Sequence, residues 1–174
     1  MKKILVFALL IIVCFTFAAC GPKDYVLNEK TFFVVMTNIQ YYPEQYLKST
    51  IEFDCFTYKL EDVVSNETYI CGVRKCSAGY GCICGNDTII GFVLEYDGEL
   101  PEPSIHQSEN TKEQTWVHLV GKLKNTDKLS ISIPSYANGT PDPSNPEQIQ
   151  FLVFVVSSCE LIEDYSNLNH YVTK

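Results

Sequence analysis

The sequence is short of positive charge. Its 174 residues carry 13 lysines and arginines against 21 aspartates and glutamates, which gives a formal net charge of −8. Nucleic-acid phosphates demand a basic protein face, and anionic lipids attract basic segments for the same reason. We therefore exclude nucleic acid as a partner, and we exclude electrostatic docking on anionic lipid.

Signatures of catalysis are also missing. The chain has no G-x-S-x-G, no P-loop, no glycine-rich dinucleotide fingerprint and no H-E-x-x-H pattern. A C-x-x-C pair, which is typical of thiol-redox sites, does not occur either. The three histidines are scattered along the chain and nothing marks a catalytic triad. The sequence predicts a protein that is not an enzyme.

Apolar runs of near-membrane length are confined to the N-terminus. Lys2 and Lys3 precede an uncharged, mostly apolar stretch over residues 4–19, which is the layout of a secretory signal peptide. Residues 17–20, Phe-Ala-Ala-Cys, resemble a bacterial lipobox, in which the cysteine becomes the first mature residue and carries lipid. Ordinary cleavage near this point, giving a secreted protein, and an uncleaved anchor are the alternatives.

Three regions follow from this N-terminus. We expect residues 1–19 to be the signal peptide, residues 20–30 a lipidated Cys20 with a polar tether, and residues 31–174 one domain. Removing the signal takes away two lysines and no acid, so 11 basic residues face 21 acidic ones and the net charge becomes −10. Acyl chains on Cys20 predict an exported protein anchored to the bacterial cell membrane or outer membrane.

Short apolar segments separated by turn signals fill the rest of the chain. Residues 32–36 are compatible with a lead-in strand or a short helix, and residues 42–46 with a turn or single helical turn. The proline-containing residues 97–114 and 134–147 predict surface loops. Strands are predicted over residues 50–58, 67–73, 88–96, 115–123, 129–133 and 148–161. Several short strands with no long helix predict an all-β fold, either a small barrel or a sandwich.

Several pieces of the chain also occur in a characteristic order. The apolar residues 32–39 precede Pro-Glu-Gln-Tyr at 43–46 and the strand at 51–58, and Cys-Ile-Cys-Gly-Asn-Asp at 82–87 precedes Gly-Phe-Val at 91–93. Trp-Val-His-Leu-Val-Gly then begins at Trp116. This order resembles an uncharacterised bacterial family whose members carry an OB-like β-barrel domain behind transmembrane helices and are paired with a predicted permease.

The resemblance extends over residues 31–165 and implies both a fold and a partner. The implied fold is a small OB-like (Greek-key) β-barrel of about five strands. The implied partner is a membrane permease linked to metal transport. This chain departs from the family where an adjacent cysteine pair becomes Cys82-Ile83-Cys84, and where a lipid anchor replaces the transmembrane helices.

The cysteines are the strongest chemical signal. Four of the eight fall in one glycine-rich stretch, and two others lie in the predicted signal and at the predicted anchor. Six is an even number in an exported protein, so disulfides are the default expectation, with fifteen pairings to choose from. The six cysteines of the mature domain are Cys55, Cys71, Cys76, Cys82, Cys84 and Cys159.

Two other states of this cluster stay open. Cys71, Cys76, Cys82 and Cys84, with Asp87 or His118, have the ligand types that zinc prefers, although their spacing is not that of a zinc ribbon. The family's cysteine–aspartate motif implies such a ligand set. Redox-active thiols are the third state, since Arg74 and Lys75 beside Cys76 supply positive charge.

These patterns together predict a membrane-anchored, non-catalytic binding or accessory module, with zinc as its candidate ligand and metal transport as its context. The first alternative is a disulfide-stapled structural or interaction domain without a small-molecule site. The second is a thiol-redox protein.

Overall fold

The computed structural model describes residues 23–76, 88–103, 114–137, 140–169 and 171–172, and within them strands dominate. The elements are β1 (Tyr25–Leu27), α2 (Phe32–Tyr41), the 3-10 helix η1 (Pro43–Gln45), β2 (Ile51–Glu61), β3 (Thr68–Cys76), β4 (Thr88–Glu95), β5 (Trp116–Ala137), β6 (Thr140–Leu161) and β7 (Tyr171–Val172). The predicted all-β class is confirmed. Among these residues no helix has the length and apolar character needed to cross a bilayer.

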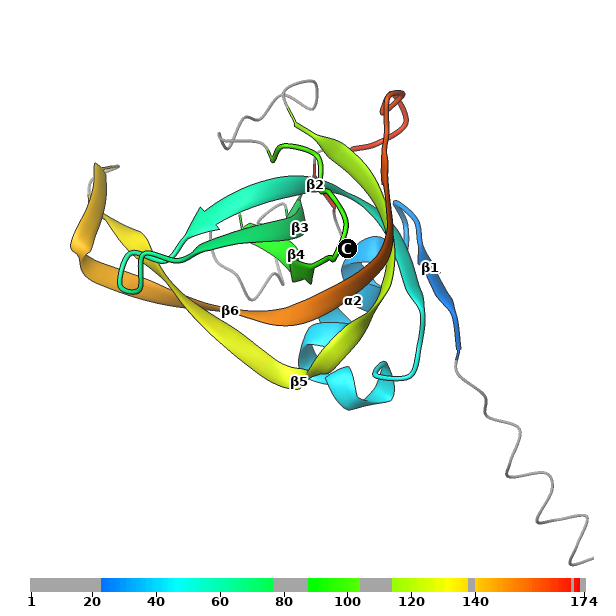
Figure 1. Ribbon diagram of the computed structural model, residues 1–174, viewed down its shortest axis with the longest axis horizontal. Helices are drawn as coiled ribbons and strands as arrows, with labels where there is room; N and C mark the ends of the chain where they lie inside the picture. The colour runs from blue at the N-terminus through cyan, green and yellow to red at the C-terminus, as the bar shows by residue number, and fades with distance from the viewer. Residues whose placement is uncertain (1–22, 77–87, 104–113, 138–139, 170, 173–174) are drawn as a thin grey trace, which may run out of the picture.

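Five strands close into a ring. The sheet runs in the order β1-β2-β5-β6-β4-β3-β7, and β2 pairs with β3 as well, so β2, β3, β4, β6 and β5 follow one another around a barrel (Figure 1). The β4–β6 pair is parallel, whereas the other pairs of the ring are antiparallel. Of the two predicted architectures, the chain therefore adopts the barrel.

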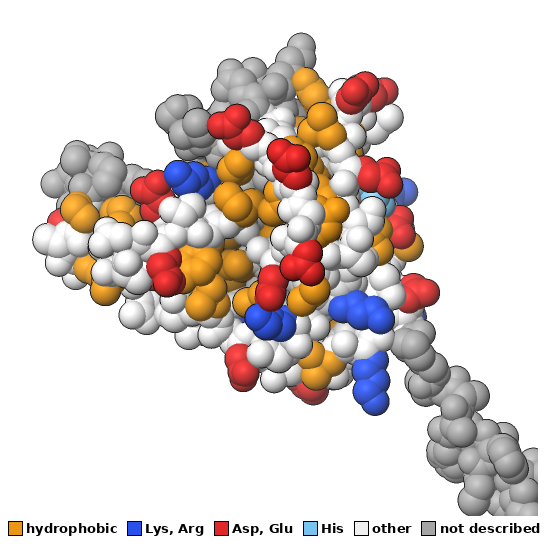
Figure 2. Space-filling view, in the orientation of Figure 1, with side chains coloured by type: hydrophobic (Ala, Val, Ile, Leu, Met, Phe, Trp, Pro, Cys, Tyr) orange, Lys and Arg blue, Asp and Glu red, His pale blue; other side chains and the backbone are white. Residues whose placement is uncertain are grey.

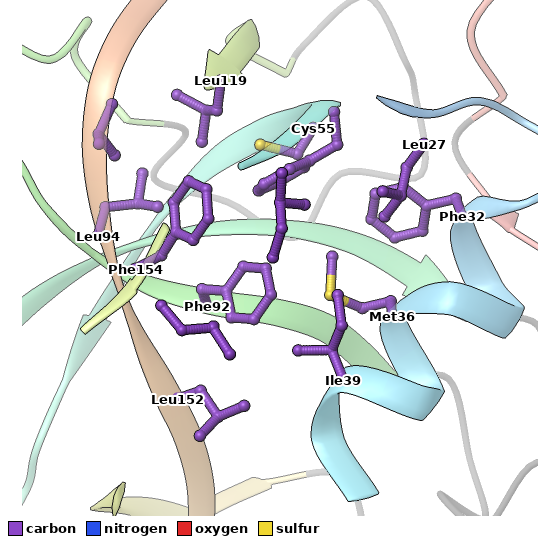
Figure 3. Close-up of a cluster of buried hydrophobic side chains, with 14 of the residues drawn as sticks. Leu27, Phe32, Met36, Ile39, Cys55, Phe92, Leu94, Leu119, Leu152 and Phe154 are labelled. Carbon is purple, nitrogen blue, oxygen red and sulfur yellow. The ribbon is translucent and has the colours of Figure 1, made fainter. Parts of the chain in front are cut away.

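The helix α2 covers one part of the barrel core. Its residues Phe32, Met36 and Ile39 recur at helical spacing and are almost fully buried, which resolves the strand-or-helix ambiguity of this segment. They pack among the aromatic side chains of the barrel interior (Figure 3). There the rings of Phe92 and Phe154 stack with centroids 5.1 Å apart. The predicted helical turn after α2 is η1.

The prediction of a loop over residues 134–147 is wrong. In the described part of this segment β5 and β6 remain paired, with Ser135 opposite Asp142, and form a two-stranded arm that extends beyond the ring (Figure 1). Each strand of such an arm needs a partner on one side, so its prolines can occupy the other edge. Pro134 itself lies at a register shift between Ile133 and Ser135.

The ring has a seam between β2 and β3. These strands pair over Phe56 to Glu61 of β2. The residues of β2 that precede Phe56 do not pair with β3, and Ile51 to Phe53 among them pair with β1 in a parallel register. Residues 25–27, expected to belong to a tether, thus form part of the sheet. On the other side of the seam β7 pairs with the end of β3. The two ends of the described chain therefore flank the same opening.

Candidate functional site

A cleft with a volume of about 680 Å³ lies beside the β2–β3 hairpin and the β5–β6 arm. Its walls come from the end of β2, the start of β3, the part of β5 at Ile133 and Pro134, and the segment after β4. The apolar part of the lining includes Tyr58, Leu60, Val63, Ile70 and Ile133. Ligand pockets in proteins range from about 300 to 1,000 Å³ and have mostly apolar walls with a few polar groups. The cleft has the size and lining of a binding site.

One buried carboxylate joins the two walls. Asp62 accepts hydrogen bonds from the backbone N–H groups of Val64 and Ser65 at 2.8 and 2.9 Å, and from that of Ser132 on β5 at 3.1 Å. The backbone N–H of Val63 donates to the carbonyl oxygen of Ser132 at 2.9 Å. These backbone N–H donors lower the pKa of Asp62 below its ordinary value. These hydrogen bonds of Asp62 and Val63, called here the Asp62 clasp, hold the β2–β3 hairpin against the β5–β6 arm. They thereby fix the shape of the cleft.

The charged groups of the cleft are mostly acidic. Lys59 forms an exposed ion pair with Glu61, with 3.3 Å between Nζ and Oε1, so its charge is already balanced. Glu102 adds a second carboxylate, on a segment held to the start of β5 by a 2.9 Å hydrogen bond from the Thr115 hydroxyl to the Glu102 carbonyl oxygen. Acidic side chains also spread among hydrophobic ones over the face of the molecule drawn in Figure 2. This surface disfavours phosphate ligands and favours apolar or basic ones.

The three described thiols are free, and two of them are buried. Cys55 and Cys71 are fully buried in the core, and Cys159 is half-buried, with no disulfide among them. Burial raises the pKa of Cys71 to about 12, and it raises the pKa of Cys55 well above its ordinary value. A thiol in an apolar interior stays protonated and is a poor nucleophile. These positions give the redox interpretation no support.

The strands also hold several of the candidate cysteines apart. Cys55 on β2 lies opposite Val117 of β5, while Cys159 on β6 lies opposite Leu119 of the same strand. With β5 between them, Cys55 and Cys159 are about 9.5 Å or more apart at Cα, beyond the reach of a disulfide. Along β3, Cys71 and Cys76 are separated by about 16 Å. Neither pair is placed to form a disulfide in this fold.

The structure does not place the predicted lipid-attachment residue or the remaining predicted ligands. Cys20, Cys82, Cys84 and Asp87 lie outside the described residues, as does the side chain of Cys76 at the end of β3. Within the described ranges, no group of three or more histidine, cysteine, aspartate or glutamate side chains is arranged to hold a metal ion. The metal site therefore stays a prediction that concerns residues 76–87.

His118, a suggested ligand, has another set of contacts. It lies on β5 with its Nδ1 2.7 Å from Asp54 Oδ1 and its Nε2 3.3 Å from Glu52 Oε1. Both carboxylates are on β2, directly across the ladder or two residues along from His118. Both ring nitrogens thus face carboxylates. His118 joins β2 to β5 on the partly exposed surface of the barrel.

Arg74 has a role that the sequence did not reveal. Predicted to supply positive charge beside Cys76, it is 1% exposed, and its guanidinium lies 2.8 Å from a carboxylate oxygen of Glu29 and donates to the carbonyl oxygen of Asn169. It also lies over the Trp116 ring, 4.9 Å from the centroid. Arg74 therefore ties the segment before α2 and the C-terminal tail to the barrel seam. No local sequence pattern predicts these contacts, because the residues that Arg74 contacts are far from it in the chain.

A known relative matches part of the chain. Over 105 residues the sequence is 26% identical to the UPF0703 protein YcgQ of Bacillus subtilis (strain 168). This chain is similar to a UPF0703 protein. The match extends over 59% of this chain and 31% of the relative, so the chain spans about a third of that protein. No protein-family model and no solved structure matches the chain. The similarity agrees with the resemblance to an uncharacterised bacterial family, whereas the lipid anchor and the permease stay predictions.

Proposed function

We propose that this chain is an exported lipoprotein whose OB-like barrel is a non-catalytic binding module, with the cleft as its binding surface. The strand order supports an OB-like barrel: the first strand of the ring, β2, pairs with the second and fourth, and the third and fifth are parallel. OB folds bind their ligands near the loop between strands 1 and 2 and the loop between strands 4 and 5. The β2–β3 hairpin and the β5–β6 arm occupy those places, and the cleft beside them is the observation that carries the proposal.

The occupant that fits this cleft is an extended segment of a membrane protein partner, with apolar side chains and at least one basic residue. Apolar side chains would pack against Leu60, Ile70 and Ile133. The basic residue would face Glu102, whose charge has the complementary sign. A phosphate-bearing ligand would meet carboxylates here, in keeping with the acidic composition of the chain. The permease implied by the family resemblance is the natural source of such a segment.

Site-specific photocrosslinking in the native membrane tests the cleft. We expect a photoreactive residue at Lys59, on the cleft rim, to give a discrete product with a membrane protein. The matched control is Lys124, which is also exposed and also ion-paired with a glutamate, Glu95, but lies outside the cleft lining. We expect no product from position 124.

Charge reversal distinguishes a specific product from a chance encounter. Glu102→Lys should reduce the product from position 59 at least several-fold, because a basic segment would then meet a like charge. Equal products from positions 59 and 124, or a product from position 59 that survives Glu102→Lys, would refute the cleft as the partner's site.

Zinc binding by the cysteine segment belongs to the same proposal. Its ligands would be Cys82 and Cys84 with Asp87, and zinc would serve there as ligand or cargo rather than as a catalyst. We expect full-length protein purified without oxygen to contain zinc that is lost on Cys82→Ser and on Cys84→Ser. Cys71→Ser is the control, since that thiol is buried elsewhere, and it should leave the zinc content unchanged.

The two alternatives predict different states of the cysteines in the same preparation. A disulfide-stapled domain would contain bridges and no metal, which would exclude the zinc proposal. A thiol-redox protein would contain a low-pKa thiol that reacts rapidly with alkylating reagents near neutral pH. The raised pKa values of Cys55 and Cys71 confine such a thiol to the other cysteines.

A further inference from the structure

One end of the domain exposes aromatic side chains on an uncharged helix. Tyr41 and Tyr42, at the C-terminal end of α2, are 53% and 52% exposed, and their ring centroids lie 6.4 Å apart. Val34, seven residues before Tyr41 and therefore on the same helical face, is 48% exposed. The sequence of α2, FFVVMTNIQY, has no charged residue. A surface helix in water normally carries charged side chains on its outer face, so this face is unusual.

The described chain begins at the same end of the molecule. Lys23 lies over the ring of Tyr25, 5.0 Å from its centroid, and the Tyr25 ring contacts that of Tyr46 at 4.9 Å between centroids. Tyr46 closes the η1 turn, which follows directly on Tyr42. Figure 1 shows the start of β1 and the η1 turn at the same end of the domain. The entry of the chain therefore contacts the η1 turn, whose other end is Tyr42.

The length of chain before Lys23 fixes how far this end can lie from a membrane. Cys20, the proposed site of acylation, precedes Lys23 by three residues. Three residues span at most about 11 Å even when fully extended. If the acyl chains of Cys20 are in the bilayer, Lys23 and its surroundings lie at the level of the headgroups or just above them. Tyrosine is enriched at that level, because its ring is apolar and its hydroxyl is polar.

We propose that the face formed by Val34, Tyr41 and Tyr42 docks on the lipid bilayer. The proposal rests on the Cys20 anchor of the proposed function and goes beyond it, because it fixes the orientation of the barrel relative to the membrane. Docking through apolar and aromatic contact suits a chain that carries excess negative charge. Around this face the exposed lysines Lys23, Lys30 and Lys48 stand against Asp24 and Glu44, so the local charge is small and a zwitterionic bilayer suffices.

Depth-dependent fluorescence quenching tests this orientation. The mature acylated protein, which begins at Cys20, is placed in phosphatidylcholine vesicles whose acyl chains carry bromine, a short-range quencher of tryptophan. The test variant is Tyr41→Trp, and the matched control is Val64→Trp, at a 68% exposed position on the β2–β3 hairpin away from β1. The natural Trp116 is 1% exposed and gives both variants the same background. We expect quenching several-fold stronger at position 41 than at position 64, and unaffected by high salt.

The outcomes separate the docking surface from the anchor. Protein that stays on the vesicles through Cys20 but shows equal quenching at the two positions would overturn the docking surface and leave the anchor standing. Quenching at position 41 that disappears in high salt would overturn the apolar mode of docking. Protein that does not bind the vesicles at all would overturn the anchor and the docking surface together.

Discussion

Gly91→Ala is expected to destabilise the barrel by about 3 kcal/mol or more. A Cβ at position 91 would lie 2.0 Å from the carbonyl oxygen of Gly72 and 2.8 Å from Cα of Val73, and both are backbone atoms of β3. Since neither atom can rotate away, β3 and β4 would have to separate. The carbonyl oxygen of Gly91 also accepts a 3.0 Å hydrogen bond from the side chain of Gln40 on α2, and this contact with the helix would be disturbed too.

Thermal unfolding followed by circular dichroism measures this effect. For a domain of this size a loss of 3 kcal/mol lowers Tm by roughly 6–12 °C. Gly98→Ala is the matched control, because the added Cβ meets only the end of the Tyr96 side chain in an exposed turn and that ring can move. We expect its Tm to change by at most about 2 °C. A Gly91→Ala protein as stable as the Gly98→Ala protein would contradict the close approach of β3 and β4.

The strands of the ring were predictable where local alternation and burial agree. The segment 50–58 alternates apolar and polar residues because one side of β2 faces the barrel core. In β6 the continuous apolar run 151–156 marks the part of the strand that enters the core, where Phe151, Leu152 and Phe154 are buried. The extension of β5 and β6 was not predictable, because the effect of a proline on a strand depends on which edge lacks a partner. That information is tertiary, so the prolines at 134–146 indicated a loop.

The cleft could not be predicted from the sequence. Leu60, Glu102 and Ile133 come from three segments that only the ring closure brings together. A local signal existed for its clasp: Asp62 is followed by serine and asparagine, which is typical of a turn, and Asn66 has a positive φ of 58°. The cysteine spacing, by contrast, placed Cys71 in one cluster with Cys76, Cys82 and Cys84, whereas Cys71 is buried in the core and lies five residues from Cys76 along the same strand. The spacing of cysteines along the chain does not predict which of them the folded sheet brings together and which it separates.

Cys20→Ser is expected to release the protein from the membrane entirely. Each buried methylene of an acyl chain contributes ~0.8 kcal/mol, and two chains are needed for firm anchoring. Serine cannot form the thioether that carries the lipid, so the variant would lose this contribution completely. The docking face on α2 is too small to replace it, since its exposed apolar side chains, Val34, Tyr41 and Tyr42, are only about half exposed. Membrane attachment through Cys20 is the premise on which the partner, the zinc context and the orientation of the barrel all depend.

Membrane fractionation combined with intact mass measurement tests that premise most directly. The account predicts that wild-type protein is found in the membrane fraction, begins at Cys20 and carries the added mass of acyl chains. It predicts that Cys20→Ser protein is absent from the membrane fraction after a wash. A Cys20→Ser protein that stays in the membrane and is still cleaved at the same place, or a wild-type protein without acyl mass, would contradict the account.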